Sequence, residues 1–266
     1  MTGAIEFEQT GAVGSVTISH PGRLNAMTRA MWRELRSVFE AVQASTSLRC
    51  VVVRGRDGHF CAGGDISEYA AFRFEEDSLR AFHEDEVWGG LQAMLACDVP
   101  LVAQIEGHCM GAGVEIASCC DIRIAGASAR FGAPIARLGF PMAPREAALV
   151  MREAGALTAR QMLLEAAVFD ATQMHTRGFL SRILADDLVA ADAQATAARV
   201  ARLAPQAARR NKQTLRALNR GPDQYQSAQS AINSVAQVLS NAYTYASSDE
   251  HREGVIAFVD KREPRF

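Results

Sequence analysis

Two glycine-rich stretches decide the fold of this 266-residue chain: residues 59–66 read HFCAGGDI, and residues 107–115 read GHCMGAGVE. Each follows a short, continuous apolar run, at residues 50–53 and 101–105, of the kind that forms a strand buried on both faces of a parallel sheet. Parallel neighbours need a helical crossover, and a helical stretch is expected from about residue 77 to residue 96. Ligands of open parallel sheets bind beyond the carboxyl ends of the strands, so we expect both turns to border one crevice.

Further strands and a capped helix complete the N-terminal part of the predicted fold. Residues 5–8, 13–18 and 122–125 are expected as strands because they are short and apolar or alternating. Thr28 is expected to cap a helix. The apolar face of that helix recurs at helical spacing through Met31, Leu35, Val38, Phe39 and Val42.

The character of the chain changes after Pro144, where alanine, leucine and arginine dominate and strand signals nearly vanish. The helices predicted in this part span residues 144–154, 158–166, 186–203, 206–218, 222–246 and 249–261. The sequence therefore predicts an α/β core over residues 1–200. The helical C-terminal region, residues 201–266, is expected to pack on that core or on a neighbouring subunit.

Composition and charge exclude several classes of partner. The formal net charge is −2 and the sequence pI is about 6.3, whereas nucleic-acid and acidic-membrane binding need a clustered basic surface. No apolar run is long enough to span a bilayer, and the acidic start of the chain is unlike a secretory leader. The six cysteines show no CxxC pair or disulfide spacing, so we expect reduced thiols in a cytoplasmic protein.

The two glycine-rich turns have the chemistry of an anion-stabilising site. Glycine lets the backbone approach a ligand closely, and the N–H groups at a helix start are unpaired. Two such turns that point into one crevice can hold a developing oxyanion, and removal of one such donor costs about 3–4 kcal/mol of transition-state stabilisation. Turns of this kind also bind phosphates or simply form tight corners. Neither a GxGxxG nor a GxxxxGK[ST] pattern is present, so no dinucleotide or P-loop site is indicated.

Four motifs, in order along nearly the whole chain, resemble those of the crotonase, or enoyl-CoA hydratase/isomerase, superfamily. They are PGRLNAM at 21–27, FCAGGDI at 60–66, the turn at 107–115 followed by Cys120-Asp121, and EGVIAFVDKR at 253–262. The resemblance implies a spiral of ββα units around a core sheet, with a helical C-terminal region used for trimerisation. A homotrimer or a dimer of trimers is therefore expected.

The resemblance also implies a substrate and a set of binding groups. The substrate is an acyl-CoA thioester, and the N–H groups of Gly64 and Ala112 are expected to hold its carbonyl oxygen. The residues expected to contact coenzyme A are Arg23, Ala26, Ala62, Ile66, Phe258 and Lys261. The last two often act from a neighbouring subunit. No metal and no cofactor beyond the substrate's own coenzyme A are expected.

Only one carboxylate suited to acid–base catalysis is found at an expected position. Glu115 lies three residues beyond Ala112, where an acidic side chain either stabilises a helix N-terminus or moves a proton at the substrate. The resemblance favours the second role, because Glu115 matches one of the two glutamates of hydratases. The other glutamate would follow Pro134 in the segment FGAP, and here that position is Ile135.

Several functions remain open on these residues. The leading interpretation is hydration of an enoyl-CoA, with Glu115 as the acid or base. Because Ile135 cannot transfer a proton, isomerisation, decarboxylation or thioester hydrolysis on the same site is an alternative. So is an acyl-CoA-binding protein with weakened catalysis.

Other side chains have both a structural and a functional interpretation. We expect Arg145-Glu146 as the solvated start of a helix, with partial compensation for the missing glutamate as the alternative. Arg137 either lies on the surface or recognises an acidic acyl group. A Cys–His nucleophile at His59 and Cys61 or at His108 and Cys109 is disfavoured, because neighbours in sequence rarely have the required geometry. The remaining histidines, including His83, are expected to be structural or exposed. The resemblance places these side chains near the acyl end: Tyr69, Phe72, Phe82, Trp88, Phe140, Pro141 and Met142.

Overall fold

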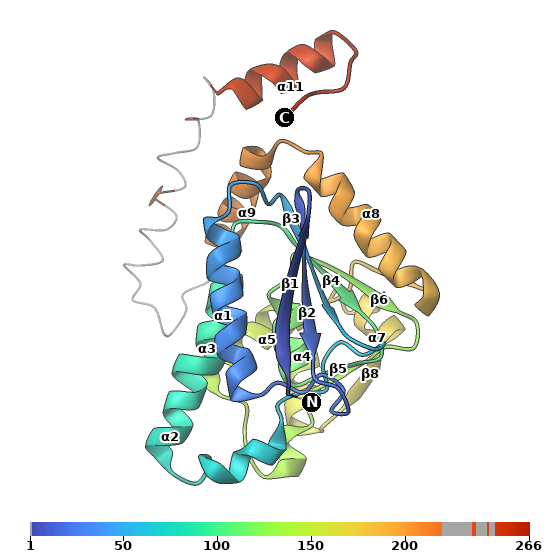
Figure 1. Ribbon diagram of the computed structural model, residues 1–266. Helices are drawn as coiled ribbons and strands as arrows, with labels where there is room; N and C mark the ends of the chain where they lie inside the picture. Colours follow the sequence, from blue (N-terminus) through green and yellow to red (C-terminus); the bar gives the residue numbers. More distant parts are fainter. Residues whose placement is uncertain (1, 220–235, 238–243, 245–247) are drawn as a thin grey trace.

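A six-stranded sheet forms the centre of the computed structural model, which describes residues 2–219, 236–237, 244 and 248–266 (Figure 1). Its strands, in spatial order, are β1 (Ala4–Thr10), β2 (Val13–Ser19), β3 (Cys50–Gly55), β4 (Leu101–Ile105), β6 (Ile122–Gly126) and β9 (Arg182–Leu184). β1 and β2 are an antiparallel hairpin, and all the other pairs are parallel. β3 and β4 are neighbours, with Val51 opposite Leu101, so the predicted parallel pair is confirmed.

A second, three-stranded sheet was not predicted. It contains β5 (His108–Met110), β7 (Arg130–Gly132) and β8 (Val168–Asp170). β5 lies inside the second glycine-rich stretch, which the sequence indicates only as a turn. Strands of three residues are too short to show an alternating pattern, which is why these three and β9 escaped prediction.

The helices of the core cover both faces of the main sheet. α1 (Arg29–Ala44) begins where the Thr28 hydroxyl oxygen accepts a hydrogen bond from the Met31 N–H at 3.2 Å, as predicted. The stretch predicted over 77–96 is three consecutive segments: α2 (Glu76–Ala81), a π-helical segment η2 (Phe82–Val87) and α3 (Trp88–Ala96). The second glycine-rich turn opens α4 (Ala112–Ser118).

The remaining helices follow the predicted order. The described ones are α5 (Pro144–Ala154), α6 (Ala156–Leu164), α7 (Ala171–Thr176), α8 (Val189–Ala201), α9 (Pro205–Asn219) and α11 (Asp249–Val259), with the short 3-10 turns η1 (Ile66–Ala71), η3 (Ile135–Leu138) and η4 (Asp186–Leu188). α7 was not predicted. α6 starts two residues before its expected boundary, directly after Gly155, whose φ is +86°. The helix predicted over 222–246 lies outside the described residues, apart from 236, 237 and 244.

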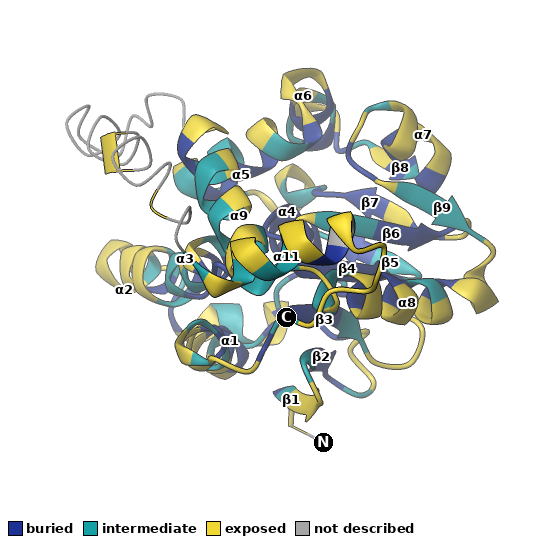
Figure 2. Cartoon of the chain, turned by 90° about the horizontal axis from the view of Figure 1, so that it is seen from above, coloured by how far each residue is buried: buried dark blue, intermediate teal, exposed yellow. Residues whose placement is uncertain are grey.

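Alternate residues of β3 enter two different apolar clusters. Val51 and Val53 belong to the large cluster shared with α1, α3 and α4, whereas Cys50 and Val52 pack with the α8 residues Val189, Ala193 and Ala197. The strand is therefore buried on both faces, as its continuous apolar sequence predicted. Figure 2 shows the buried segments of β6 and β7 in dark blue inside the molecule, whereas the outer faces of the surrounding helices are yellow.

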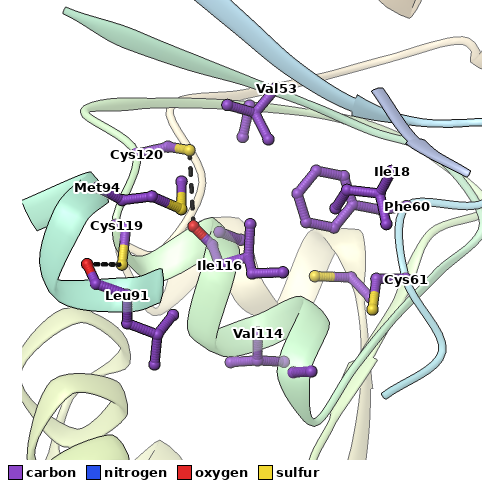
Figure 3. Packing of buried hydrophobic residues seen from close by; sticks show 14 of the residues in the cluster. Ile18, Val53, Phe60, Cys61, Leu91, Met94, Val114, Ile116, Cys119 and Cys120 are labelled. Carbon is purple, nitrogen blue, oxygen red and sulfur yellow. Dashed lines mark hydrogen bonds between the residues drawn. The ribbon is translucent and has the colours of Figure 1, made fainter. Parts of the chain in front are cut away.

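All six cysteines are free and buried. Figure 3 shows two of them at the end of α4: the Cys119 thiol donates to the Leu91 carbonyl at 3.7 Å, and the Cys120 thiol to the Ile116 carbonyl at 3.6 Å. All six fill the core, and the redox state expected for them stays a prediction.

α9 is fastened to the core by charged side chains. Lys212 Nζ lies 2.7 Å from Asp121 Oδ2 and donates to the Val99 carbonyl at 2.9 Å, and Arg216 Nη2 lies 2.7 Å from Asp98 Oδ1. The division at residue 200 stays a prediction. None of the helices in the described ranges combines the length and hydropathy needed to cross a bilayer.

Candidate active site

The two glycine-rich turns are joined by backbone hydrogen bonds. The Cys61 N–H donates to the His108 carbonyl and the Met110 N–H donates to the Cys61 carbonyl, both at 2.8 Å. A Cβ on Gly113 would lie 2.5 Å from the Cys61 carbonyl oxygen, closer than such atoms approach. Glycine at 113 is therefore required for α4 to begin against the first turn.

The N–H groups of Gly64 and Ala112 remain available to a ligand. Among the described residues, no acceptor takes a hydrogen bond from either group, although their neighbours are paired. The Asp65 N–H donates to the Met27 carbonyl at 2.8 Å, and the Gly111 N–H to the Gly132 carbonyl at 2.8 Å. Gly64 and Ala112 both line one cavity of about 200 Å³.

Most of the cavity wall is apolar. Its larger apolar side chains are Trp32, Ile66, Phe82, Val87, Met110, Ile135, Leu138, Phe140, Pro141 and Met142. Of the side chains expected near an acyl group, Tyr69, Phe82 and the residues at 140–142 line the cavity. Phe72 and Trp88 do not line it: the Phe72 ring packs against Phe82, with centroids 4.6 Å apart, and the Trp88 indole N–H donates to Gln92 at 2.7 Å.

Two carboxyl groups, from neighbouring helices, line this cavity. Glu115 of α4 is 8% exposed and Glu146 of α5 is 2% exposed. Burial, and then the negative charge of Glu146, raise the pKa of Glu115 well above its ordinary 4.5. The expectation that Glu146 lies in solvent is wrong. Pro144 does begin α5, but Glu146 is on the face of the helix that also buries Leu149 and Val150.

Only one of the two carboxylate oxygens of Glu146 has a hydrogen-bond partner among the described residues. The His83 ring nitrogen Nδ1 lies 3.2 Å from Glu146 Oε1, whereas Oε2 has no hydrogen-bond partner among the described residues. On the other side of the ring, Arg73 Nη1 lies 3.5 Å from His83 Nε2. With its proton on Nδ1, His83 donates to Glu146 and accepts from Arg73. The cavity thus holds a polar relay of Arg73, His83 and Glu146.

The sequence did not indicate this relay. His83 was expected to be structural or exposed, but it lines the cavity beside Arg73. Its contact with Glu146 joins residues 63 positions apart, and no local motif marks either partner. His83 lies in the π-helical segment η2, next to the buried Phe82, and such segments recur at functional sites, but this feature appears only in the structure.

The residues expected to contact coenzyme A fall into two groups. Ala62 and Ile66 line the cavity, and the Ala62 N–H donates to the Leu24 carbonyl at 3.0 Å, which places the segment with Arg23 and Ala26 beside the first turn. α11, which precedes Lys261, lies at the opposite end of the molecule from α2 (Figure 1). Lys261 is not among the residues that line the cavity. The structure does not bring Lys261 to the cavity of its own chain, and the side chain of Phe258 lies outside the described part. Their role from a neighbouring subunit stays a prediction.

Two minor alternatives are settled by burial. Cys61 and Cys109 are fully buried, burial raises the pKa of Cys61 to about 12, and the rings of His59 and His108 stack on each other at 5.0 Å. A Cys–His nucleophile is therefore contradicted. Arg137 is exposed and donates to the Ala166 carbonyl at 3.4 Å, outside the cavity.

Comparison with known proteins places this fold and site in one family. The family model for enoyl-CoA hydratase/isomerase matches residues 8–266, so the chain belongs to that family and to the crotonase superfamily. Its relatives include the 2,3-dehydroadipyl-CoA hydratase of Escherichia coli K12, 31% identical over 94% of this chain and 93% of the relative. A probable enoyl-CoA hydratase of Rhizobium meliloti is 28% identical over 97% and 96%.

Solved structures agree with this assignment. An enoyl-CoA hydratase/carnithine racemase from Magnetospirillum magneticum matches with a TM-score of 0.88 at 33% identity, covering 98% of this chain and 94% of the other. Pseudomonas aeruginosa AtuE matches with a TM-score of 0.84 at 33% identity, covering 98% of each chain. The predicted crotonase fold is confirmed, and the chain is an enzyme of a lyase and isomerase family. Within the described residues, no cluster of metal-ligating side chains was found.

Proposed function

We propose that the protein adds water to the conjugated double bond of a 2-enoyl-CoA thioester. The observation that carries this proposal is the pair of buried carboxyl groups, Glu115 and Glu146, in the cavity that Gly64 and Ala112 also line. Ile135 lines the same cavity, at the position where the resemblance leads one to expect the second glutamate. In this proposal α5 supplies the second carboxylate in its place.

The thioester oxygen would bind between the N–H groups of Gly64 and Ala112. These donors are fixed by the surrounding backbone, so they need no reorganisation when negative charge develops on the oxygen. The low polarity of the cavity strengthens the interaction, and each donor is expected to contribute about 3–4 kcal/mol to transition-state stabilisation.

The two carboxyl groups would divide the proton transfers. Glu115 is the acid, because its raised pKa favours the protonated form, and Glu146 is the base, because its Oε2 has no hydrogen-bond partner among the described residues and can accept from a water molecule. Glu146 takes a proton from water as the hydroxide adds to Cβ, and the electron pair of the double bond moves through Cα to the thioester oxygen. The resulting enolate takes the proton of Glu115 at Cα. Proton exchange with solvent then restores both groups.

Isomerisation is the second candidate, because Ile135 makes the cavity more apolar and a double-bond shift needs no water. The same pair would remove a proton at one carbon and return one at another. The resulting 3-enoyl and 2-enoyl thioesters have equal mass, whereas hydration adds one water.

The test combines a panel of enoyl-CoA thioesters with Glu115→Gln and Glu146→Gln. We expect each variant to lower kcat by about 10²–10⁴-fold, with water added in the wild-type product. Glu40→Gln, an exposed change on α1, is the matched control. A product of unchanged mass would favour isomerisation. Loss of carbon dioxide would indicate decarboxylation, and release of free coenzyme A would indicate hydrolysis. Binding without turnover would leave an acyl-CoA-binding protein, and wild-type rates in both variants would remove the pair from the mechanism.

We also propose that the protein works in the cytoplasm as a homotrimer or a dimer of trimers, with no cofactor beyond the coenzyme A of its substrate. Several apolar residues of the C-terminal helices are exposed in the single chain: Leu215, Leu218, Val255, Ile256 and Val259. A second subunit would bury them, and would bring Phe258 and Lys261 of one chain toward the thioester of the next. Sedimentation measures the assembly directly.

A further inference from the structure

The cavity that the proposed function uses also contains a guanidinium group without an acidic partner. Arg73 follows η1 and is the one arginine among the described residues that line the cavity. No carboxylate of the described residues lies within ion-pair distance of it. The nearby glutamates are paired otherwise, Glu84 with Arg145 at 2.9 Å and Glu146 with His83 at 3.2 Å.

Aromatic rings fix the orientation of this guanidinium. Its central carbon lies 3.8 Å from the centroid of the Phe140 ring and 4.6 Å from that of Tyr69. One of its nitrogens, Nη1, is occupied by His83. A guanidinium has five N–H donors, so most of the donors of Arg73 are left for a ligand. A rigidly held, partly free guanidinium is a fork suited to a carboxylate.

The electrostatics of the cavity favour such a ligand. Burial lowers the pKa of Arg73 from its ordinary 12.5, and the nearby Tyr69 and Glu146 offset this effect only in part. An anionic group of the ligand would offset the remainder. The raised pKa of Glu115 favours its neutral form, which weakens the negative charge that would otherwise repel such a group.

We propose that the natural acyl group ends in a carboxylate, so that the substrate is a monothioester of a dicarboxylic acid, and that Arg73 binds this distal carboxylate. The inference rests on the proposed function in placing the thioester carbonyl at Gly64 and Ala112. From there the acyl chain passes the two glutamates and reaches Arg73 along the wall of Tyr69 and Phe140.

Binding of saturated thioesters tests the proposal without any chemistry. Glutaryl-, adipyl- and suberyl-CoA are compared by calorimetry with pentanoyl-, hexanoyl- and octanoyl-CoA, which match them in length. At the best length we expect the acid-ended ligand to bind about 10- to 100-fold more tightly, as for a hydrogen bond to a charged group. Arg73→Met keeps the apolar stem against the rings and should abolish the difference, whereas Arg73→Lys should retain part of it.

Two further variants separate direct binding from other effects. Arg80→Met removes an exposed charge of α2 that pairs with Glu76, and it should leave the preference intact. His83→Gln interrupts the relay without removing the guanidinium, so it too should preserve the preference. Equal binding of acid-ended and neutral thioesters by the wild type at every length would overturn the proposal. So would an Arg73→Met variant that weakens both ligands by the same factor. If acid-ended and neutral thioesters bind equally well, this inference alone is refuted. If no acyl-CoA binds at all, the proposed function is refuted as well.

Discussion

The ionisation of Glu115 should make the free energy of unfolding depend on pH. Because its pKa is raised in the folded protein, the native state keeps a proton that the unfolded chain releases above about pH 4.5. The free energy of unfolding should therefore fall as the pH rises from that value toward the folded-state pKa. Glu115→Gln cannot ionise, so its stability should fall less over this range.

Melting curves from about pH 5 to pH 8 check this prediction. As the pH rises, we expect the melting temperature of Glu115→Gln to increase relative to that of the wild type. The change should be about 2–4 °C for each kcal/mol by which the variant's relative free energy of unfolding increases. Glu40→Gln, at an exposed site, should follow the wild type throughout. Parallel curves for the wild type and Glu115→Gln would show that Glu115 titrates normally in the fold.

Residue by residue, the sequence predicts the site where a role is tied to a local motif. Gly64, Ala112 and Glu115 belong to two turns whose glycines mark them, and all three line the cavity. Glu146, His83 and Arg73 have no such mark. Their contacts depend on which face of α5 and of the π-helical segment η2 turns inward, and long-range packing decides that.

Among the elements, the contact between the two glycine-rich turns should tolerate no added side chain. Gly113→Ala places a Cβ 2.5 Å from the Cys61 carbonyl oxygen, and backbone cannot move aside cheaply. We expect a loss of about 1–3 kcal/mol in the free energy of unfolding, as for overpacking elsewhere. Activity should fall too, since Ala112 lies beside the displaced atoms.

Gly89→Ala in α3 is the matched control. Its new Cβ would make an ordinary contact, 3.5 Å from the Arg36 side chain, within a regular helix. Alanine is the better helix former, so this variant should gain about 0.5–1 kcal/mol. Chemical denaturation measures both variants, and equal losses would mean that backbone conformation rather than the close approach matters at Gly113.

Elements were predictable in proportion to their length. Unbroken apolar runs predict β3 and β4. α5 begins and ends at its predicted residues because Pro144 and Gly155 bound it. The three-residue strands β7, β8 and β9 give too few positions for any period, and only pairing with distant strands defines them.

For the whole molecule, the attachment of α9 to the core should be sensitive to acid. Burial works to raise the pKa of Asp98, but hydrogen bonds from Gln213, Gln43 and Arg216 outweigh it and hold that pKa below the ordinary 3.8. The stability from this carboxylate is present above about pH 4 and is lost as the pH falls through the lower folded-state value.

Hydrogen exchange of residues 205–219 measures this attachment. Below about pH 4, exchange in α9 should accelerate in the wild type more steeply than in Asp98→Asn, which lacks the titrating group but is weaker at neutral pH. Exposed Asp249→Asn is the control. If exchange in α9 accelerates equally below this pH in the wild type and in Asp98→Asn, the acid-sensitive contact lies elsewhere.

The burial of every native thiol has a practical consequence. Burial raises the pKa of all six, to about 12 for Cys50, Cys61 and Cys120, so at neutral pH they carry almost no nucleophilic thiolate. Maleimides and mild oxidants should therefore leave the native fold unmodified. A single Leu164→Cys change, at an exposed position of α6 away from the C-terminal helices, would then accept a fluorophore selectively, and energy transfer between labelled copies would report how they associate.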